Sequence, residues 1–159
     1  MPIVLPPGPV VVSACLLGRA CRYDGGHCRH EGVLRFLAGR RVVPVCPESL
    51  GGLVIPRPPA EIAGGDGRDV LAGRAKVLDR EGKDVTAAFL RGAEAALAEA
   101  EACGAKAAVL KERSPSCGVH WIYDGTFSRT LRPGPGVAAA LVAGRGMATI
   151  ASEEEVAGW

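Results

Sequence analysis

Lys111-Glu112-Arg113-Ser114-Pro115-Ser116-Cys117-Gly118 is the stretch that decides the fold. It follows an apolar run over residues 105–110, whose length and boundaries are typical of a short buried strand. Charged residues, then Ser-Pro and Cys-Gly, end that strand abruptly, so we expect Cys117 on a turn just beyond its carboxyl end.

The same arrangement occurs twice earlier in the chain. A strand expected over residues 9–14 runs into Cys15, and a second strand expected over 42–45 runs into Cys46. Ligands of open parallel sheets bind outside the carboxyl ends of the strands. The sequence therefore predicts that the three thiols, including Cys117, gather at one edge of one sheet.

The other segments complete an α/β pattern. The periodicity predicts helices near residues 33–37, 86–103, 137–143 and after Ser152, and a further strand over 147–150. Strands that alternate with helices imply right-handed crossovers and a parallel sheet covered on both faces. We expect a small Rossmann-like three-layer fold with about four or five strands and a small hairpin, in one domain over residues 1–159.

The connections carry more local predictions. The Pro-rich segment 55–61 is expected to be an ordered loop that crosses the site, and the Gly-rich segment 64–74 an exposed, mobile loop. Residues 75–85 are expected to form a small hairpin, and Asp124-Gly125 predicts another within residues 121–127. Asp84 or Thr86 is predicted to cap the long helix.

Composition narrows the classes of partner. The net charge is +2 and aromatic residues make up 4% of the chain, so neither bulk nucleic-acid binding nor base stacking is expected. No apolar run is long enough to span a membrane, which predicts a cytoplasmic protein. Six cysteines in such a chain favour metal binding or catalysis over disulfides. An Ala-rich helix and Trp159 would suit a homodimer interface.

The three strand-end cysteines suggest an open metal site. Three thiolates leave a tetrahedral zinc ion or a four-iron cluster one ligand short, and an open position lets a metal act as a Lewis acid on substrate. The spacing of Cys15, Cys46 and Cys117 matches no local zinc or ferredoxin motif and does not choose between these metals. Glu48 follows Cys46 closely and is a candidate to activate water or move a proton, or a surface acid. Ser114 could orient a substrate or simply cap its turn.

A second, local group is less specific. Cys21, Cys28, His27 and His30 could bind another metal, but their spacing is not that of a known zinc finger, and unrelated thiols in a reduced loop are the favoured explanation. Cys103 lies near the end of the long helix and is expected to pack.

The motifs of this chain, taken together, resemble the 2-thiouracil desulfidase family in its short, single-domain form. The matching stretches are Val12–Gly18, Arg22–Gly26, Cys46–Glu48 with Gly51–Leu53, Pro56–Ile62, Gly82–Thr86, Lys111–Gly118 and Tyr123–Phe127. They occur in order and span about residues 10–150 of the chain.

The resemblance implies an enzyme with an oxygen-sensitive [4Fe-4S] cluster held by Cys15, Cys46 and Cys117, with Glu48 and Ser114 as catalytic residues. Its fourth iron would polarise the thiocarbonyl sulfur of a small thiolated base in a non-redox reaction that yields uracil and hydrogen sulfide. Two alternatives stay open: a three-cysteine zinc metallohydrolase or transferase, and a non-catalytic iron–sulfur sensor or sulfur carrier.

Overall fold

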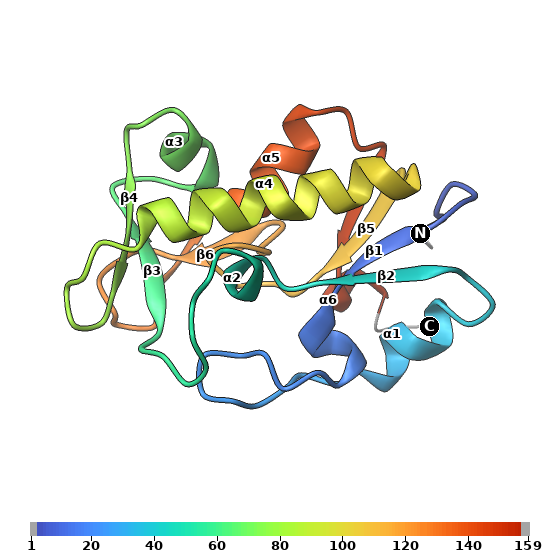
Figure 1. Cartoon of the computed structure of the whole chain (residues 1–159), viewed down its shortest axis with the longest axis horizontal. Helices are drawn as coiled ribbons and strands as arrows, with labels where there is room; N and C mark the ends of the chain where they lie inside the picture. The colour runs from blue at the N-terminus through green and yellow to red at the C-terminus, as the bar shows by residue number, and fades with distance from the viewer. Residues whose placement is uncertain (1–2, 157–159) are drawn as a thin grey trace.

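A four-stranded parallel sheet forms the centre of the computed structural model, which describes residues 3–156 (Figure 1). Its strands, in spatial order, are β2 (Val42–Val45), β1 (Val10–Ser13), β5 (Ala107–Leu110) and β8 (Thr149–Ser152). All three neighbouring pairs are parallel. The predicted α/β fold with a four-stranded sheet is thus what the chain forms.

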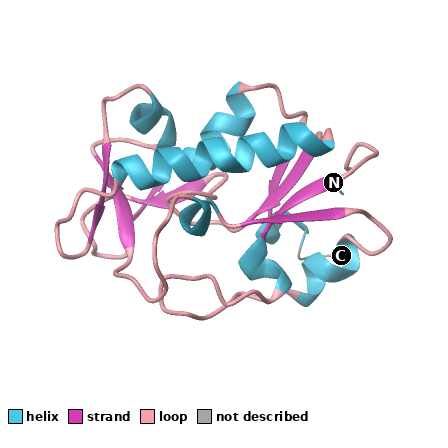
Figure 2. Cartoon of the chain, viewed as in Figure 1, coloured by secondary structure: helices cyan, strands magenta, loops and turns pink. Residues whose placement is uncertain are grey.

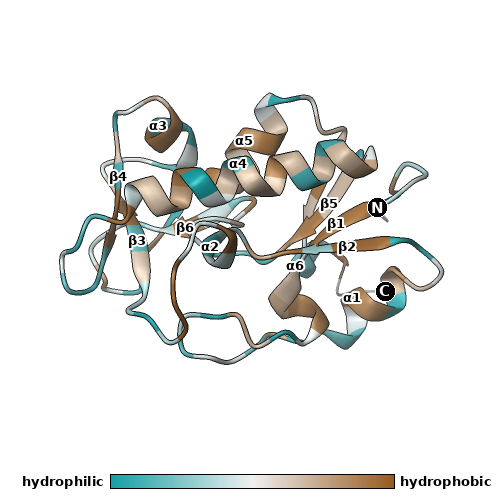
Figure 3. Ribbon diagram, viewed as in Figure 1, coloured by the Kyte–Doolittle hydropathy of each residue, from teal (hydrophilic) through white to brown (hydrophobic). Residues whose placement is uncertain are grey.

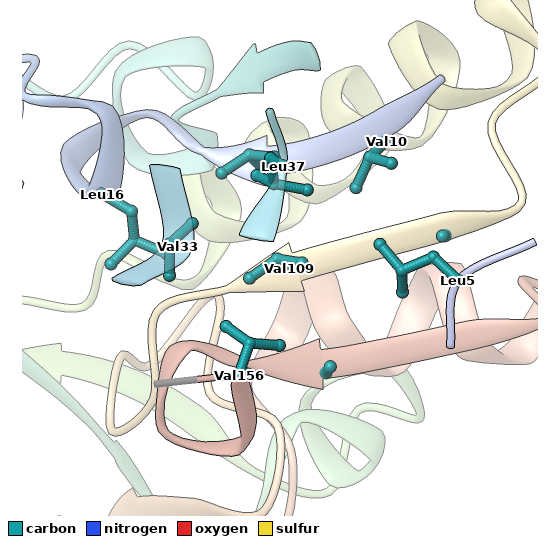
Figure 4. Packing of buried hydrophobic residues seen from close by; sticks show 10 residues of the cluster. Leu5, Val10, Leu16, Val33, Leu37, Val109 and Val156 are labelled. Atoms are coloured by element: carbon teal, nitrogen blue, oxygen red, sulfur yellow. The ribbon is translucent and has the colours of Figure 1, made fainter. Parts of the chain in front are cut away.

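Helices cover both faces of this sheet, as expected for strands that are apolar on both sides. The helices are α4 (Thr86–Cys103) and α5 (Val137–Gly144) on one face, and η1 (Ala14–Leu17), α1 (Glu31–Phe36) and α6 (Glu153–Val156) on the other. Val10 and Val12 pack toward η1, α1 and α6, whereas Val11 packs toward α4 and α5. Figure 4 shows the first of these cores, and Figure 3 shows how apolar the central strands are.

The order of the strands places a switch point between β1 and β5. The chain leaves β1 toward β2 across the α1 face and reaches β5 from β2 across the α4 face. Where successive connections leave on opposite faces, the loops separate and open a crevice at the carboxyl ends of the strands. Cys15 and Cys117 follow the two strands that flank this point.

Beyond that edge lies a smaller group of elements with its own apolar core (Figure 2). It contains β3 (Ala60–Ala63), α3 (Gly67–Leu71), β4 (Lys76–Asp79), β6 (Trp121–Tyr123) and β7 (Leu131–Pro133). The strands form two antiparallel pairs, β3 with β4 and β6 with β7. Phe89 of α4, Ile62 and Ile122 are almost completely buried among them.

Two predictions for this region are wrong and one is confirmed. Residues 60–63 form β3 rather than the end of a loop. The small hairpin expected over 75–85 is present, with an antiparallel bridge between Leu78 and Asp84 and a backbone hydrogen bond from Val85 to Val77, and β4 pairs with β3 in addition. The 64–74 segment contains α3, because Asp66 and Asp69 form a reciprocal capping box that stabilises its first turn. The second hairpin exists, but β6 and β7 are joined by residues 124–130 rather than by a tight Asp-Gly turn.

The long helix α4 has the predicted bounds, but its predicted caps are wrong. Val85 occupies the N-cap position and contributes no side-chain hydrogen bond. The Thr86 hydroxyl accepts instead from the amide of Val77, and Asp84 accepts from the amide of Thr86. Gly104 ends the helix in a left-handed conformation, as glycine does most readily.

None of the helices within residues 3–156 is long and apolar enough to cross a membrane. Trp159, which the sequence singled out, lies outside the described residues.

Candidate functional site

A single cleft of about 370 Å³ brings the three predicted thiols together at the carboxyl edge of the sheet. Cys15 lies in η1 directly after β1, Cys46 is the N-cap residue of α2 (Pro47–Leu50) directly after β2, and Cys117 lies on the turn after β5. These segments are distant in sequence but adjacent in the sheet, because β1 pairs with both β2 and β5.

The thiols differ in environment. Cys117 lies on a turn as predicted, but it is 5% exposed and packs in the core on the α4 face. Burial raises the pKa of Cys117 to about 12. The pKa of Cys46 is raised too, first by the neighbouring Cys21 thiol and then by burial. Both thiols are therefore protonated at neutral pH in the metal-free protein.

Cys21 also lines this cleft, although the sequence assigned it no role there. The Cys46 thiol donates to the Cys21 carbonyl oxygen at 3.8 Å, and the neighbouring Cys15 thiol is the main cause that raises the pKa of Cys21. Nothing in a Cys-Arg-Tyr turn signals this proximity, which depends on how the loop after η1 folds back toward α2.

Glu48 projects from the first turn of α2 into the same cleft. Its side chain is 18% exposed and is paired with Arg57, whose Nη2 lies 3.2 Å from Glu48 Oε1. Burial raises the pKa of Glu48, while the Arg57 guanidinium and the Ser116 hydroxyl oppose that rise. A carboxylate with a raised pKa is a stronger base than an ordinary one, which suits a group that has to take up a proton.

The position of Glu48 depends on a close helix contact. A Cβ at Gly92 of α4 would lie 1.8 Å from the Pro47 carbonyl oxygen, and one at Gly51 would lie 2.0 Å from that of Ala88. Only glycine at both places lets the backbones of α2 and α4 approach this closely. The short helix that carries Glu48 is therefore docked on the longest helix of the protein.

The Ser-Pro-Ser-Cys turn is held by its own hydroxyl groups. Ser114 Oγ accepts from the amides of Ser116 and Cys117 at 3.1 and 3.0 Å, so the predicted capping role of Ser114 is present. Ser116, which the sequence did not single out, is buried and donates to Glu48 Oε2 at 3.4 Å. The two hydroxyl oxygens lie 3.0 Å apart, so a hydrogen-bonded chain links Ser114 to Glu48.

Glu112 stabilises the segment that follows this turn through its buried carboxylate. It is 1% exposed, and its Oε1 accepts from the amides of Val119, His120 and Trp121 at 2.7 to 3.0 Å. The amide of Glu112 itself donates to Glu153 Oε1. These three backbone donors explain why this carboxylate is buried.

The far wall of the cleft comes from the β3–β4 and β6–β7 pairs. Glu61 Oε1 accepts from the amides of Gly125 and Phe127, and this fixes the loop after β6 against β3. Phe127, Arg129 and Arg113 have positive φ angles and all line the cleft. Non-glycine residues in this conformation are concentrated at functional sites, where the surrounding structure enforces it.

The second predicted group does not converge. His27 Nδ1 and His30 Nδ1 accept from the amides of Arg29 and Val33, and both rings thereby stabilise their local turns. Cys28 packs against the core of the α1 face. Within residues 3–156, no three His, Cys, Asp or Glu side chains are arranged to hold one metal ion.

Comparisons with known proteins agree with this geometry. A family model described as 2-thiouracil desulfurase matches residues 10–155. The uncharacterized protein YbbK of Bacillus subtilis (strain 168) is 46% identical over 145 residues, which cover 91% of this chain and 96% of YbbK. A solved structure, the [4Fe-4S]-dependent thiouracil desulfidase TudS (DUF523Vcz), superimposes with a TM-score of 0.81 at 40% identity and covers 94% of this chain and 93% of its own.

Proposed function

The chain belongs to the 2-thiouracil desulfurase family, and from this premise we propose that it converts 2-thiouracil to uracil and hydrogen sulfide with a [4Fe-4S] cluster. The observation that carries the proposal is that the thiols of Cys15, Cys46 and Cys117 and the carboxyl group of Glu48 line one cleft. A volume of about 370 Å³ falls within the range of small-molecule sites.

The donor set fits such a cluster. In an iron–sulfur cube each cysteine binds a different iron, so the thiols need not converge on one point as they do around zinc. Cys15, Cys46 and Cys117 come from three neighbouring strand ends, and we propose that they hold three of the four irons. When bound, the cluster would supply a soft Lewis acid that prefers the sulfur of the substrate to the oxygen of the product.

Glu48 is placed to handle the proton chemistry. Its ionised form would take a proton from the water that replaces sulfur on the ring, and its raised pKa lets it hold that proton. Arg57 and Ser116 bond to different oxygens of the carboxyl group and so fix its orientation. A fixed base at the wall of the cleft acts without the cost of ordering it during the reaction.

Ser114 is proposed to position the substrate. Two backbone amides already donate to its oxygen. Ser114 can therefore act as a hydrogen-bond donor through its hydroxyl, either to an acceptor on the substrate ring or to Ser116. A loss of this hydrogen bond should weaken substrate binding and orientation more than proton transfer.

We also propose a cytoplasmic location. All six cysteines are free of disulfides, and thiols persist in this state in a reducing compartment.

The decisive measurement is iron and acid-labile sulfide per chain after anaerobic reconstitution, together with the turnover of 2-thiouracil to uracil. Cys15→Ser, Cys46→Ser and Cys117→Ser should lose the cluster, whereas Cys103→Ser should keep it, because that thiol bonds only to the Ala100 carbonyl of its own helix. Glu48→Ala should keep the cluster and lose turnover. Zinc without sulfide under strict anaerobic conditions would refute the proposal.

A further inference from the structure

The cleft contains four thiols rather than the three that the family-based assignment uses. Cys21 lines it with Cys15, Cys46 and Cys117, and the neighbouring Cys15 thiol raises the pKa of Cys21. It comes from the loop between η1 and α1, not from a strand end. The fourth thiol thus approaches the site from a different side of the cleft than the sheet.

The position of Cys21 is fixed by its backbone as well as its side chain. Its carbonyl oxygen accepts from Arg57 Nη2 at 3.1 Å and from Cys46 Sγ at 3.8 Å, and its amide donates to the Arg19 carbonyl at 2.9 Å. Arg57, which pairs with Glu48, is itself 6% exposed. One buried guanidinium therefore binds both the backbone of the Cys21 loop and the Glu48 carboxyl group.

Cys21 differs from Cys117 in accessibility. Cys117 is buried in the core and cannot leave its place without disturbing the sheet, whereas Cys21 is partly exposed on a loop. Three thiolates leave one iron of a four-iron cluster without a protein ligand, and a thiolate is a preferred ligand of such iron. A thiol that is near the cluster ligands but free of the sheet is suited to bind and release that iron.

We propose that Cys21 is an exchangeable fourth ligand of the cluster. In the absence of substrate its sulfur binds the iron that Cys15, Cys46 and Cys117 leave free, and the thiocarbonyl sulfur of the substrate displaces it. Cys21 releases its proton to solvent when the iron–sulfur bond forms and takes up a proton when that bond breaks, and no electron is transferred. This inference rests on the proposed function and adds to it a protein ligand that protects the reactive iron between turnovers.

Oxidation of the cluster tests the proposal, because the iron without a permanent ligand is the one that is lost. Wild type, Cys21→Ser, Cys21→Ala and the control Cys103→Ser are reconstituted anaerobically and treated with ferricyanide, and electron paramagnetic resonance follows the [3Fe-4S] signal. Both Cys21 variants should start with four irons per chain and lose one several-fold faster than wild type and the control. Added 2-mercaptoethanol should slow this loss in Cys21→Ala. Equal rates in all four proteins would overturn the proposal and leave the desulfidase assignment intact.

A second experiment uses the wild-type protein alone. Iodoacetamide labelling with peptide mass mapping should find Cys21 protected in the loaded protein and labelled once 2-thiouracil is added, with Cys103 labelled equally in both states. Labelling of Cys21 that does not respond to 2-thiouracil would overturn the exchange, as would variants of Cys21 that hold no cluster at all, because Cys21 would then be a permanent ligand. A wild-type protein without a four-iron cluster would refute the proposed function itself.

Discussion

Gly92→Ala separates the effect of helix propensity from that of helix docking. Alanine in the middle of an isolated helix is favoured over glycine by about 1 kcal/mol. In this protein, however, the new Cβ would lie 1.8 Å from the Pro47 carbonyl oxygen, and contacts below 3.0 Å do not occur. The backbone of α2 must therefore recede from α4 by about 1.2 Å.

Two losses should follow from this shift. Overpacking of a filled contact costs about 1–3 kcal/mol. Over most of that range the cost is larger than the gain of about 1 kcal/mol in helix propensity, so the variant should be less stable. At about 2–4 °C per kcal/mol for a chain of this size, the melting temperature should fall by several degrees. The shift also moves Glu48 away from Arg57 and Ser116, and a misplacement of about 1 Å can lower turnover by about 100-fold.

Gly144→Ala is the matched control. Gly144 is the last residue of α5, and a Cβ there would contact nothing within 4 Å. Thermal unfolding of the cofactor-free proteins and turnover per reconstituted cluster should show Gly144→Ala at or above wild type in both. If Gly92→Ala were as stable and as active as Gly144→Ala, the argument that glycine is required for the docking of α2 would be refuted.

Three further predictions concern the polar network. Arg57→Leu removes the positive charge that opposes the rise in the Glu48 pKa, so that pKa should increase further. The acidic limb of the pH–rate profile should then move to higher pH, and an unchanged profile would contradict the proposed role of Glu48 as base. Glu112→Ala leaves three backbone donors without an acceptor and should lower the free energy of unfolding in urea by about 3 kcal/mol or more. A loss as small as that of a surface substitution would contradict this. Ser116→Ala should reduce turnover without loss of iron or sulfide, and loss of the cluster would show that Ser116 supports Cys117 rather than Glu48.

The parts of the fold that follow from local pattern could be read from the sequence. Short apolar runs ended by charge, proline or glycine predict strands, and a long amphipathic run ended by Gly104 predicts α4 with its bounds. The strand-end positions of three cysteines then predict a shared cleft, since the carboxyl ends of parallel strands lie at the same edge of the sheet.

The parts that depend on contacts between distant segments could not be read in this way. The β3–β4 pairing joins residues 60–63 to 76–79, and α3 lies between them in a Gly-rich, charged segment whose sequence does not predict a helix. Arg57 and Ser116 become functional candidates only because folding brings both to Glu48. The burial of Glu112 likewise depends on three amides that follow it and meet one oxygen of its side chain.

The strand order also determines when the site can be completed during synthesis. Cys15 and Cys46 leave the ribosome early, but Cys117 follows β5, which must first insert beside β1. Everything from α2 to α4 has to be made before that strand exists. If Cys117 binds the cluster as proposed, cofactor insertion has to be a late event in biogenesis, and a nascent chain that presents only its first thiols would be a poor acceptor for a cluster.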